Sequence, residues 1–195
     1  ARDFTHPPKT GLRITWLGHS TLLVEIDGYT VLTDPVLSER ASPYSWIGPK
    51  RFYEPPLTFG EMPSVDVVLI SHDHYDHLDE KTVRSFLDRD PLYVMPLGVG
   101  AHLEEWGVPP DRIVERDWWA EIVLGDLTLT ATPARHFSGR SMIMADKYET
   151  LWAGWVIKTE SHSVYYSGDT GMFPQFTQIG ERLGPFDATL MDTGA

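Results

Sequence analysis

Residues 71–79, with the sequence SHDHYDHLD, place three histidines and one aspartate in the pattern His-x-His-x-Asp-His. They follow a β-branched apolar run at 65–70 and precede a helical pattern at 79–88, which predicts a turn at the carboxyl end of a buried strand. Imidazoles and carboxylates in this number are ligands for zinc, manganese or iron. Chance produces this pattern in roughly one chain in a thousand of similar composition, so we favour a metal site over a polar surface loop.

Composition limits which ligands can bind the metal and which partners the protein can have. The 195 residues fit a single domain spanning 1–195, and the absence of cysteine removes thiolate ligands. The formal net charge of −12 disfavours a nucleic-acid partner, because phosphate backbones attract clustered Lys and Arg. Apolar runs fall short of the roughly 18–20 residues that span a bilayer. We expect a cytoplasmic protein, with peripheral association at a membrane surface as an alternative.

Periodicity predicts a strand-rich chain of the α/β or α+β class, and we find no internal repeat. A hairpin is expected at Asp27-Gly28, where glycine tolerates a positive φ angle. Residues 34–62 read as a long ordered loop, and loops of this length are often functional. Asp79 is the expected N-cap of the helix at 79–88. The expected strands are 13–17, 21–26, 29–33, 65–70, 92–95, 127–132, 151–158, 163–166 and 186–191, and the expected helices are 79–88, 98–106 and 173–183.

Two further residues at strand ends join the candidate site. His136 follows the strand expected at 127–132, and Asp169 follows the strand at 163–166 between two glycines. Taken alone, a loop histidine is more often simply hydrogen-bonded, and an aspartate between glycines is more often a turn residue. A metal motif upstream changes this balance, because such a motif needs partners from distant strand ends.

Several segments across the chain carry a family resemblance beyond the histidine motif. They are TWLGHS at 15–20, LTDP at 32–35, RASP at 40–43, GPKRF at 48–52, DWW at 117–119 and SGDTG at 167–171. With the histidine motif, these segments resemble the metallo-β-lactamase superfamily. GPKRF and DWW point to the branch that contains N-acylphosphatidylethanolamine phospholipase D and its bacterial relatives, and more distantly the ascorbate-6-phosphate lactonases.

The resemblance implies a fold and a ligand set. The implied fold is an αββα sandwich of two mixed β-sheets, with the site at one edge between the sheets. The implied cofactors are two divalent metal ions, zinc as the first choice and manganese or iron as alternatives. The resemblance implies that His72, His74 and His136 hold one metal, that Asp76 and His77 contribute to the second, and that Asp169 bridges both.

One departure from the family pattern concerns the second metal. The family closes that site with a further histidine that would lie beyond residue 195, and His6, His19, His102 and His162 all lie in the wrong order to replace it. We expect His19 to support the site from outside the ligand shell. We therefore expect a C-terminally incomplete domain, whose missing segment could come from another chain; the oligomeric state stays open.

The resemblance suggests a metal-dependent hydrolase that uses a metal-bridging hydroxide on a phosphodiester or related ester, as a phospholipase D does. Asp76 would orient that hydroxide or move its proton, in addition to binding metal. Lys50 and Arg51 would neutralise a small, anionic, lipid-like substrate. The aromatic residues Tyr44, Trp46, Phe52 and Tyr53, with Trp118 and Trp119, could line an apolar substrate channel, but we expect most of them in the core. The alternatives are a lactonase or carboxylic ester hydrolase on the same metals, or a non-catalytic metal-binding domain.

Overall fold

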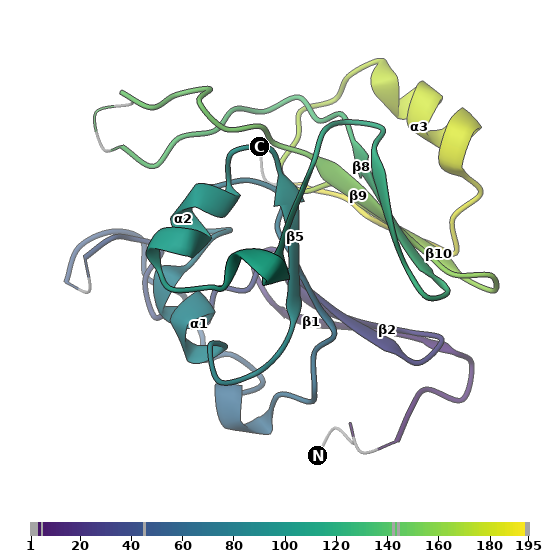
Figure 1. Cartoon of the computed structure of the whole chain (residues 1–195), viewed down its shortest axis with the longest axis horizontal. Helices are drawn as coiled ribbons and strands as arrows, with labels where there is room; N and C mark the ends of the chain where they lie inside the picture. Colours follow the sequence, from purple (N-terminus) through teal and green to yellow (C-terminus); the bar gives the residue numbers. More distant parts are fainter. Residues whose placement is uncertain (1–3, 5, 45, 142, 144, 194–195) are drawn as a thin grey trace.

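The computed structural model describes residues 4, 6–44, 46–141, 143 and 145–193. Two mixed β-sheets pack face to face, and helices cover the outer face of each sheet (Figure 1). Helices α1 (Glu80–Ser85) and α2 (Gly100–Glu105) lie against the first sheet, and α3 (Gln175–Leu183) lies against the second. This arrangement confirms the αββα sandwich implied by the family resemblance.

The first sheet contains the first six strands in sequence order. The pairs β1–β2 and β2–β3 are antiparallel, and the remaining pairs are parallel. Asp27 and Gly28 form the two-residue turn between β2 and β3, both with positive φ angles, as the sequence predicts. The strands are β1 (Leu12–Gly18), β2 (Thr21–Ile26), β3 (Tyr29–Thr33), β4 (Val67–Leu69), β5 (Leu92–Pro96) and β6 (Ile113–Arg116).

The second sheet contains the remaining five strands in the order β11-β10-β9-β8-β7. Its β10–β11 pair is parallel, and its other pairs are antiparallel. The parallel pair is connected through α3, which packs Ile179 against the outer face of this sheet. The strands are β7 (Glu121–Leu124), β8 (Leu127–Thr132), β9 (Gly154–Lys158), β10 (Ser163–Tyr166) and β11 (Ala188–Leu190).

Alternation along the strands divides the apolar side chains between layers. In β4, Val67 and Leu69 point into the core between the sheets, whereas Val68 packs on the side of α1 and α2. In β9, Trp155 and Ile157 face the first sheet, whereas Val156 packs toward α3. A strand that buries both faces reads as a continuous apolar run, which is why periodicity predicts these central strands well. Within the described residues, no helix combines the length and apolarity required to cross a bilayer.

The structure corrects several expectations from sequence. It adds the strands β6 and β7 and two short 3-10 helices, η1 (Phe59–Glu61) and η2 (Pro110–Arg112), and it starts the strand expected at 151–158 only at Gly154. The 34–62 loop holds only η1 and an isolated bridge between Arg40 and Lys50 among its described residues. Four of its aromatic side chains, Tyr44, Trp46, Phe52 and Tyr53, are exposed rather than in the core, with Phe52 at 99% and Trp46 at 75%. Phe59 alone among its described aromatic residues packs against the core.

Candidate metal centre

Three segments from the two sheets meet at one edge of the sandwich. The turn at 71–78 follows β4 and leads into α1, and it closes through backbone bonds from His77 and Leu78 to the His74 carbonyl. His136 follows β8, and Asp169 follows β10. Gly168 has a φ angle of 57°, and a Cβ atom there would lie 2.7 Å from the Ser71 Cβ. Glycine therefore lets the Asp169 loop approach the histidine turn closely.

The first donor set combines three histidines with one oxygen of Asp169. His74 Nδ1 lies 2.8 Å from His72 Nε2 and 3.2 Å from His136 Nε2. His136 Nε2 lies 3.8 Å from Asp169 Oδ2. Burial lowers the pKa of all three imidazoles, so they are neutral at pH 7 and their nitrogens have lone pairs for a metal.

The second donor set uses the other oxygen of Asp169. His77 Nε2 lies 3.1 Å from Asp169 Oδ1 and 3.8 Å from Asp76 Oδ2. Burial favours the neutral form of Asp76, but a hydrogen bond from His19 and the charge of His77 outweigh it and hold the Asp76 pKa well below its usual range. Asp169 keeps a lowered pKa as well, because His77 outweighs burial. Both side chains are therefore carboxylates.

A fully buried network behind the donors orients His77. Asp34 accepts hydrogen bonds from the Ser71 amide and hydroxyl, from the Tyr166 hydroxyl and from His77 Nδ1, which lies 2.7 Å away. Burial opposes a charge on His77, but Asp34 and Asp169 outweigh it and raise the His77 pKa to about 10. With Nδ1 held by Asp34, Nε2 points into the site.

The donors fit a metal by their chemistry and by how closely they gather. His77 Nε2 is buried and lies 3.1 Å from Asp169 Oδ1 and 3.8 Å from Asp76 Oδ2. A metal bound between this nitrogen and the two carboxylates would replace the proton that His77 carries in the metal-free chain. The donors are nitrogen and oxygen atoms only, which suits zinc, manganese and iron alike. The structure thus brings together all six residues that the sequence predicted as ligands.

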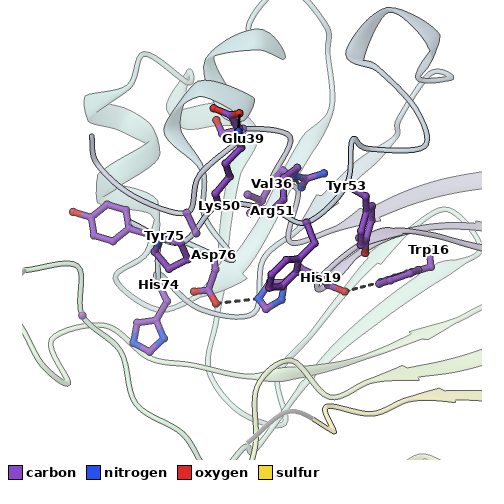
Figure 2. A pocket seen from close by; sticks show the side chains of 16 residues that line it. Trp16, His19, Val36, Glu39, Lys50, Arg51, Tyr53, His74, Tyr75 and Asp76 are labelled. Carbon is purple, nitrogen blue, oxygen red and sulfur yellow. Dashed lines mark hydrogen bonds and ion pairs between the residues drawn. The ribbon is translucent and has the colours of Figure 1, made fainter. Parts of the chain in front are cut away.

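A cavity of about 640 Å³ opens beside the second donor set, and His19, His74 and Asp76 form its floor (Figure 2). Lys50 and Arg51 both lie in its wall, but they differ in their partners. Lys50 Nζ is paired with Glu39 Oε1 at 2.5 Å. Arg51 donates from Nη2 to the Val36 carbonyl, and its Nε and Nη1 have no hydrogen-bond partner among the described residues. The other lining residues include Trp16, Ala41, Pro49, Phe52, Tyr53 and Tyr75.

Sequence reasoning assigned no contact to two residues that touch the donors. His19 lies 2.9 Å from Asp76, and Asp34 holds His77. Both stand in segments that carry the family resemblance, TWLGHS and LTDP, so the sequence singled them out without giving their partners. Their roles depend on contacts across the fold, which spacing along the chain does not encode.

Residues 29–195 match the model of the beta-lactamase superfamily domain. An uncharacterized protein of Mycobacterium tuberculosis is 53% identical over 186 residues, which are 94% of this chain and 49% of the relative. The N-acyl-phosphatidylethanolamine-hydrolyzing phospholipase D 1 of Caenorhabditis elegans is 38% identical over 197 residues, covering 96% of this chain and 55% of that protein. The chain thus spans about half the length of these curated relatives.

Shorter relatives and solved structures also include metal-dependent hydrolases or share this fold. A UPF0173 metal-dependent hydrolase of Pyrobaculum neutrophilum is 31% identical, covering 94% of this chain and 72% of the relative. CmlA, a diiron beta-hydroxylase from Streptomyces venezuelae, superimposes with a TM-score of 0.67 at 25% identity, over 94% of this chain and 35% of that one. A possible metal-dependent hydrolase from Veillonella parvula shares the fold, with a TM-score of 0.71 at 19% identity, over 94% and 71% of the two chains. The chain belongs to the metallo-β-lactamase superfamily, among its metal-dependent hydrolases.

Proposed function

We propose that this chain hydrolyses a phosphodiester or related ester in a small, anionic, lipid-like molecule. The observation that carries the proposal is the pair of donor sets that share Asp169 and open onto a cavity with largely apolar walls. Two donor sets joined by one carboxylate are typical of sites that hold two metals. Such metal pairs stabilise both the attacking oxygen and the leaving oxygen in a displacement reaction. The acidic chain favours a small substrate over a nucleic acid.

The proposed ligands follow from the donor distances. When bound, two divalent ions, zinc as the first choice, would polarise the ester and lower the pKa of a water molecule. The lowered Asp76 pKa makes its carboxylate a weak base, which supports orientation of the attacking water over removal of its proton. We assign His72, His74 and His136 to the first metal, Asp76 and His77 to the second, and Asp169 to both.

Substrate binding in this proposal depends on the wall of the cavity. Trp16 and Tyr53 offer aromatic surface to an apolar group, and their rings pack 5.8 Å apart. Arg51 is the better candidate for an anionic group, because Lys50 is already neutralised by Glu39. The name of the Caenorhabditis elegans relative, a phospholipase D, supports a phosphodiester as the bond that is cleaved.

The test compares substrates on one zinc-loaded preparation. We expect faster turnover of a lipid phosphodiester than of a lactone, and we expect His74→Ala to lower metal content and turnover together. Turnover that survives His74→Ala would refute the ligand assignment. A lactone cleaved faster than the phosphodiester would refute the proposed substrate class.

A matched pair of variants tests the anion site. Arg51→Gln should raise KM for the phosphodiester by roughly 10- to 150-fold, since a charge-assisted hydrogen bond contributes roughly 1.5–3 kcal/mol. Lys50→Gln should change KM by less than about 3-fold, because Lys50 is paired with Glu39 at the surface. Equal effects of the two substitutions would contradict the assignment of Arg51.

A further inference from the structure

Two imidazoles of the first donor set are held differently from the other histidines of the site. A metal-binding histidine usually donates its second ring nitrogen to a fixed acceptor, which sets the plane of the ring. The Nδ1 atom of His72 has such a partner in the Ser71 hydroxyl at 2.8 Å. The outer nitrogens of the other two, His74 Nε2 and His136 Nδ1, have no hydrogen-bond partner among the described residues.

One aromatic ring, that of Phe137, packs against both of these imidazoles. Its centroid lies 4.7 Å from the His74 centroid, with 65° between the ring planes. It also lies 4.7 Å from the His136 centroid, with 34° between the planes. Aromatic rings attract one another at these distances. Phe137 is not a lining residue of the 640 Å³ cavity, so it contacts His74 from a side that this cavity does not reach.

The backbone that carries Phe137 is anchored to the histidine turn. The Gly139 amide donates to one oxygen of Asp73 at 2.8 Å, and the Thr150 hydroxyl donates to the other at 2.9 Å. Asp73 is buried and directly precedes His74 in the chain. These bonds fix the segment after His136 relative to His74.

Lys147 adds a contact to the Phe137 ring itself. Its Nζ lies 4.7 Å from the Phe137 centroid and 4.9 Å from the centroid of Tyr148. An ammonium group at this distance from an aromatic ring is attracted to it. The ring that contacts the two imidazoles is therefore held through both its backbone and its side chain.

We propose that Phe137 is a positioning residue that sets the ring planes of His74 and His136 for the first metal ion. It does so where Ser71 orients His72 through a hydrogen bond. His74 Nδ1 and His136 Nε2 lie 3.2 Å apart, and rotation of either ring would separate these two donor atoms. The inference rests on the proposed function only in requiring a metal at the first donor set.

Two substitutions separate the flat face of the ring from its apolar bulk. Phe137→Tyr keeps the aromatic face, whereas Phe137→Leu keeps an apolar side chain that presents no flat surface to the imidazoles. Because Phe137 is only half-buried, we expect both variants to fold, which circular dichroism verifies. Phe176→Leu is the matched control, since Phe176 is a half-buried phenylalanine of α3 that packs against Tyr165 and Phe173, away from the donors.

The first readout is zinc affinity, measured by competition with a chromophoric chelator. The second is the visible absorption spectrum of cobalt bound at saturation, which depends on the geometry of the ligands. We expect Phe137→Leu to weaken zinc binding about 10-fold, through the loss of two aromatic contacts, and to change the cobalt spectrum. Phe137→Tyr and Phe176→Leu should match the unmodified chain in both measurements.

Three results would overturn the inference and leave the proposed function intact. They are an unchanged zinc affinity in Phe137→Leu, an equal loss of affinity in Phe137→Tyr or Phe176→Leu, and a weaker affinity in Phe137→Leu with an unchanged cobalt spectrum. The last result would show general destabilisation instead of altered ring positions. Failure of the unmodified chain to bind zinc would overturn the proposed function and this inference together.

Discussion

At the scale of single residues, Asp34 orients a donor of the site without lining the cavity. Its carboxylate is fully buried and accepts hydrogen bonds from Ser71, Tyr166 and His77. A buried charge is tolerated only when it is paired and hydrogen-bonded, and His77 supplies the opposite charge in the metal-free chain. Asp34 therefore fixes both the ring orientation of His77 and the position of the turn that carries it.

Asp34→Asn tests this role. An amide cannot accept all of these bonds and removes the nearer of the two carboxylates that balance the His77 charge, so we expect the free energy of unfolding to fall by about 3–5 kcal/mol. We also expect zinc affinity to fall roughly 10–100-fold. Asp66→Asn is the control, since Asp66 accepts one exposed bond from the Thr30 amide. Equal urea midpoints for the metal-free Asp34→Asn and Asp66→Asn chains would contradict the account.

The six predicted ligands show what sequence can and cannot supply at this scale. His72, His74, Asp76 and His77 lie within one turn, so their spacing alone indicates a common function. His19 and Asp34 contact that turn from 57 and 43 residues away, and only the fold determines that they do. Spacing therefore indicates the four donors of the turn, the family resemblance is needed to add His136 and Asp169, and the hydrogen-bond partners of the donors stay undetermined.

At the scale of elements, one guanidinium joins the two loops that carry the histidines. Arg140 Nη1 donates to the carbonyls of Asp73, near the start of the histidine turn, and of Leu78, at its end. Its guanidinium stacks on the Tyr75 ring at 4.2 Å, and the neighbouring Gly139 amide donates to Asp73. The loop after His136 thus holds the turn after β4 closed.

Arg140→Met should remove these hydrogen bonds and loosen the histidine turn. Losing two charge-assisted hydrogen bonds should lower the free energy of unfolding by about 2–4 kcal/mol and weaken zinc binding about 10-fold, as measured by urea unfolding and metal titration. Arg84→Met is the matched control, because Arg84 pairs with Glu80 on α1 and donates to the Trp106 carbonyl without contacting the histidine turn. If zinc affinity fell no further in Arg140→Met than in Arg84→Met, these hydrogen bonds would have no role in the site.

A second contact between elements predicts a pH dependence away from the site. Asp27, in the β2–β3 turn, contacts Thr159 and His162, which lie between β9 and β10. Hydrogen bonds from Thr159 and His162 lower the Asp27 pKa. A lowered carboxyl pKa gives stability that is present above the unfolded pKa of about 3.9 and is lost as pH falls through the folded value.

Asp27→Asn should therefore lower the Tm of the metal-free chain by roughly 2 °C at pH 6, with the difference shrinking as pH falls below about 4. Thermal unfolding of the two chains at several pH values between 3.5 and 7 measures this directly. A Tm difference that stayed constant across that range would show that the charge of Asp27 does not stabilise the contact.

The sequence predicts the central strands but misses the edge strands β6 and β7, for a physical reason. The central strands bury both faces, so continuous apolar runs mark them. The edge strands β6 and β7 bury little: all four residues of β6 are half-buried, and Glu121 and Val123 of β7 are exposed. Their pairing with β5 and β8 is imposed by neighbouring strands, and such tertiary pairing leaves no clear pattern in the sequence.

At the scale of the whole molecule, the site joins the two sheets. The turn that carries four donors follows β4 of the first sheet, whereas His136 and Asp169 follow β8 and β10 of the second. Metal binding should therefore link the sheets at this edge, and a ligand that binds only the folded state stabilises it. The metal centre depends on this convergence of donors from two sheets.

Anomalous diffraction from crystals of the zinc-loaded chain, recorded at the zinc absorption edge, tests this convergence most directly. We expect two peaks about 3.5–4 Å apart, one among His72, His74 and His136, the other beside Asp76 and His77, with Asp169 between them. Strong peaks located only elsewhere on the surface, with none within coordination distance of these residues, would contradict it.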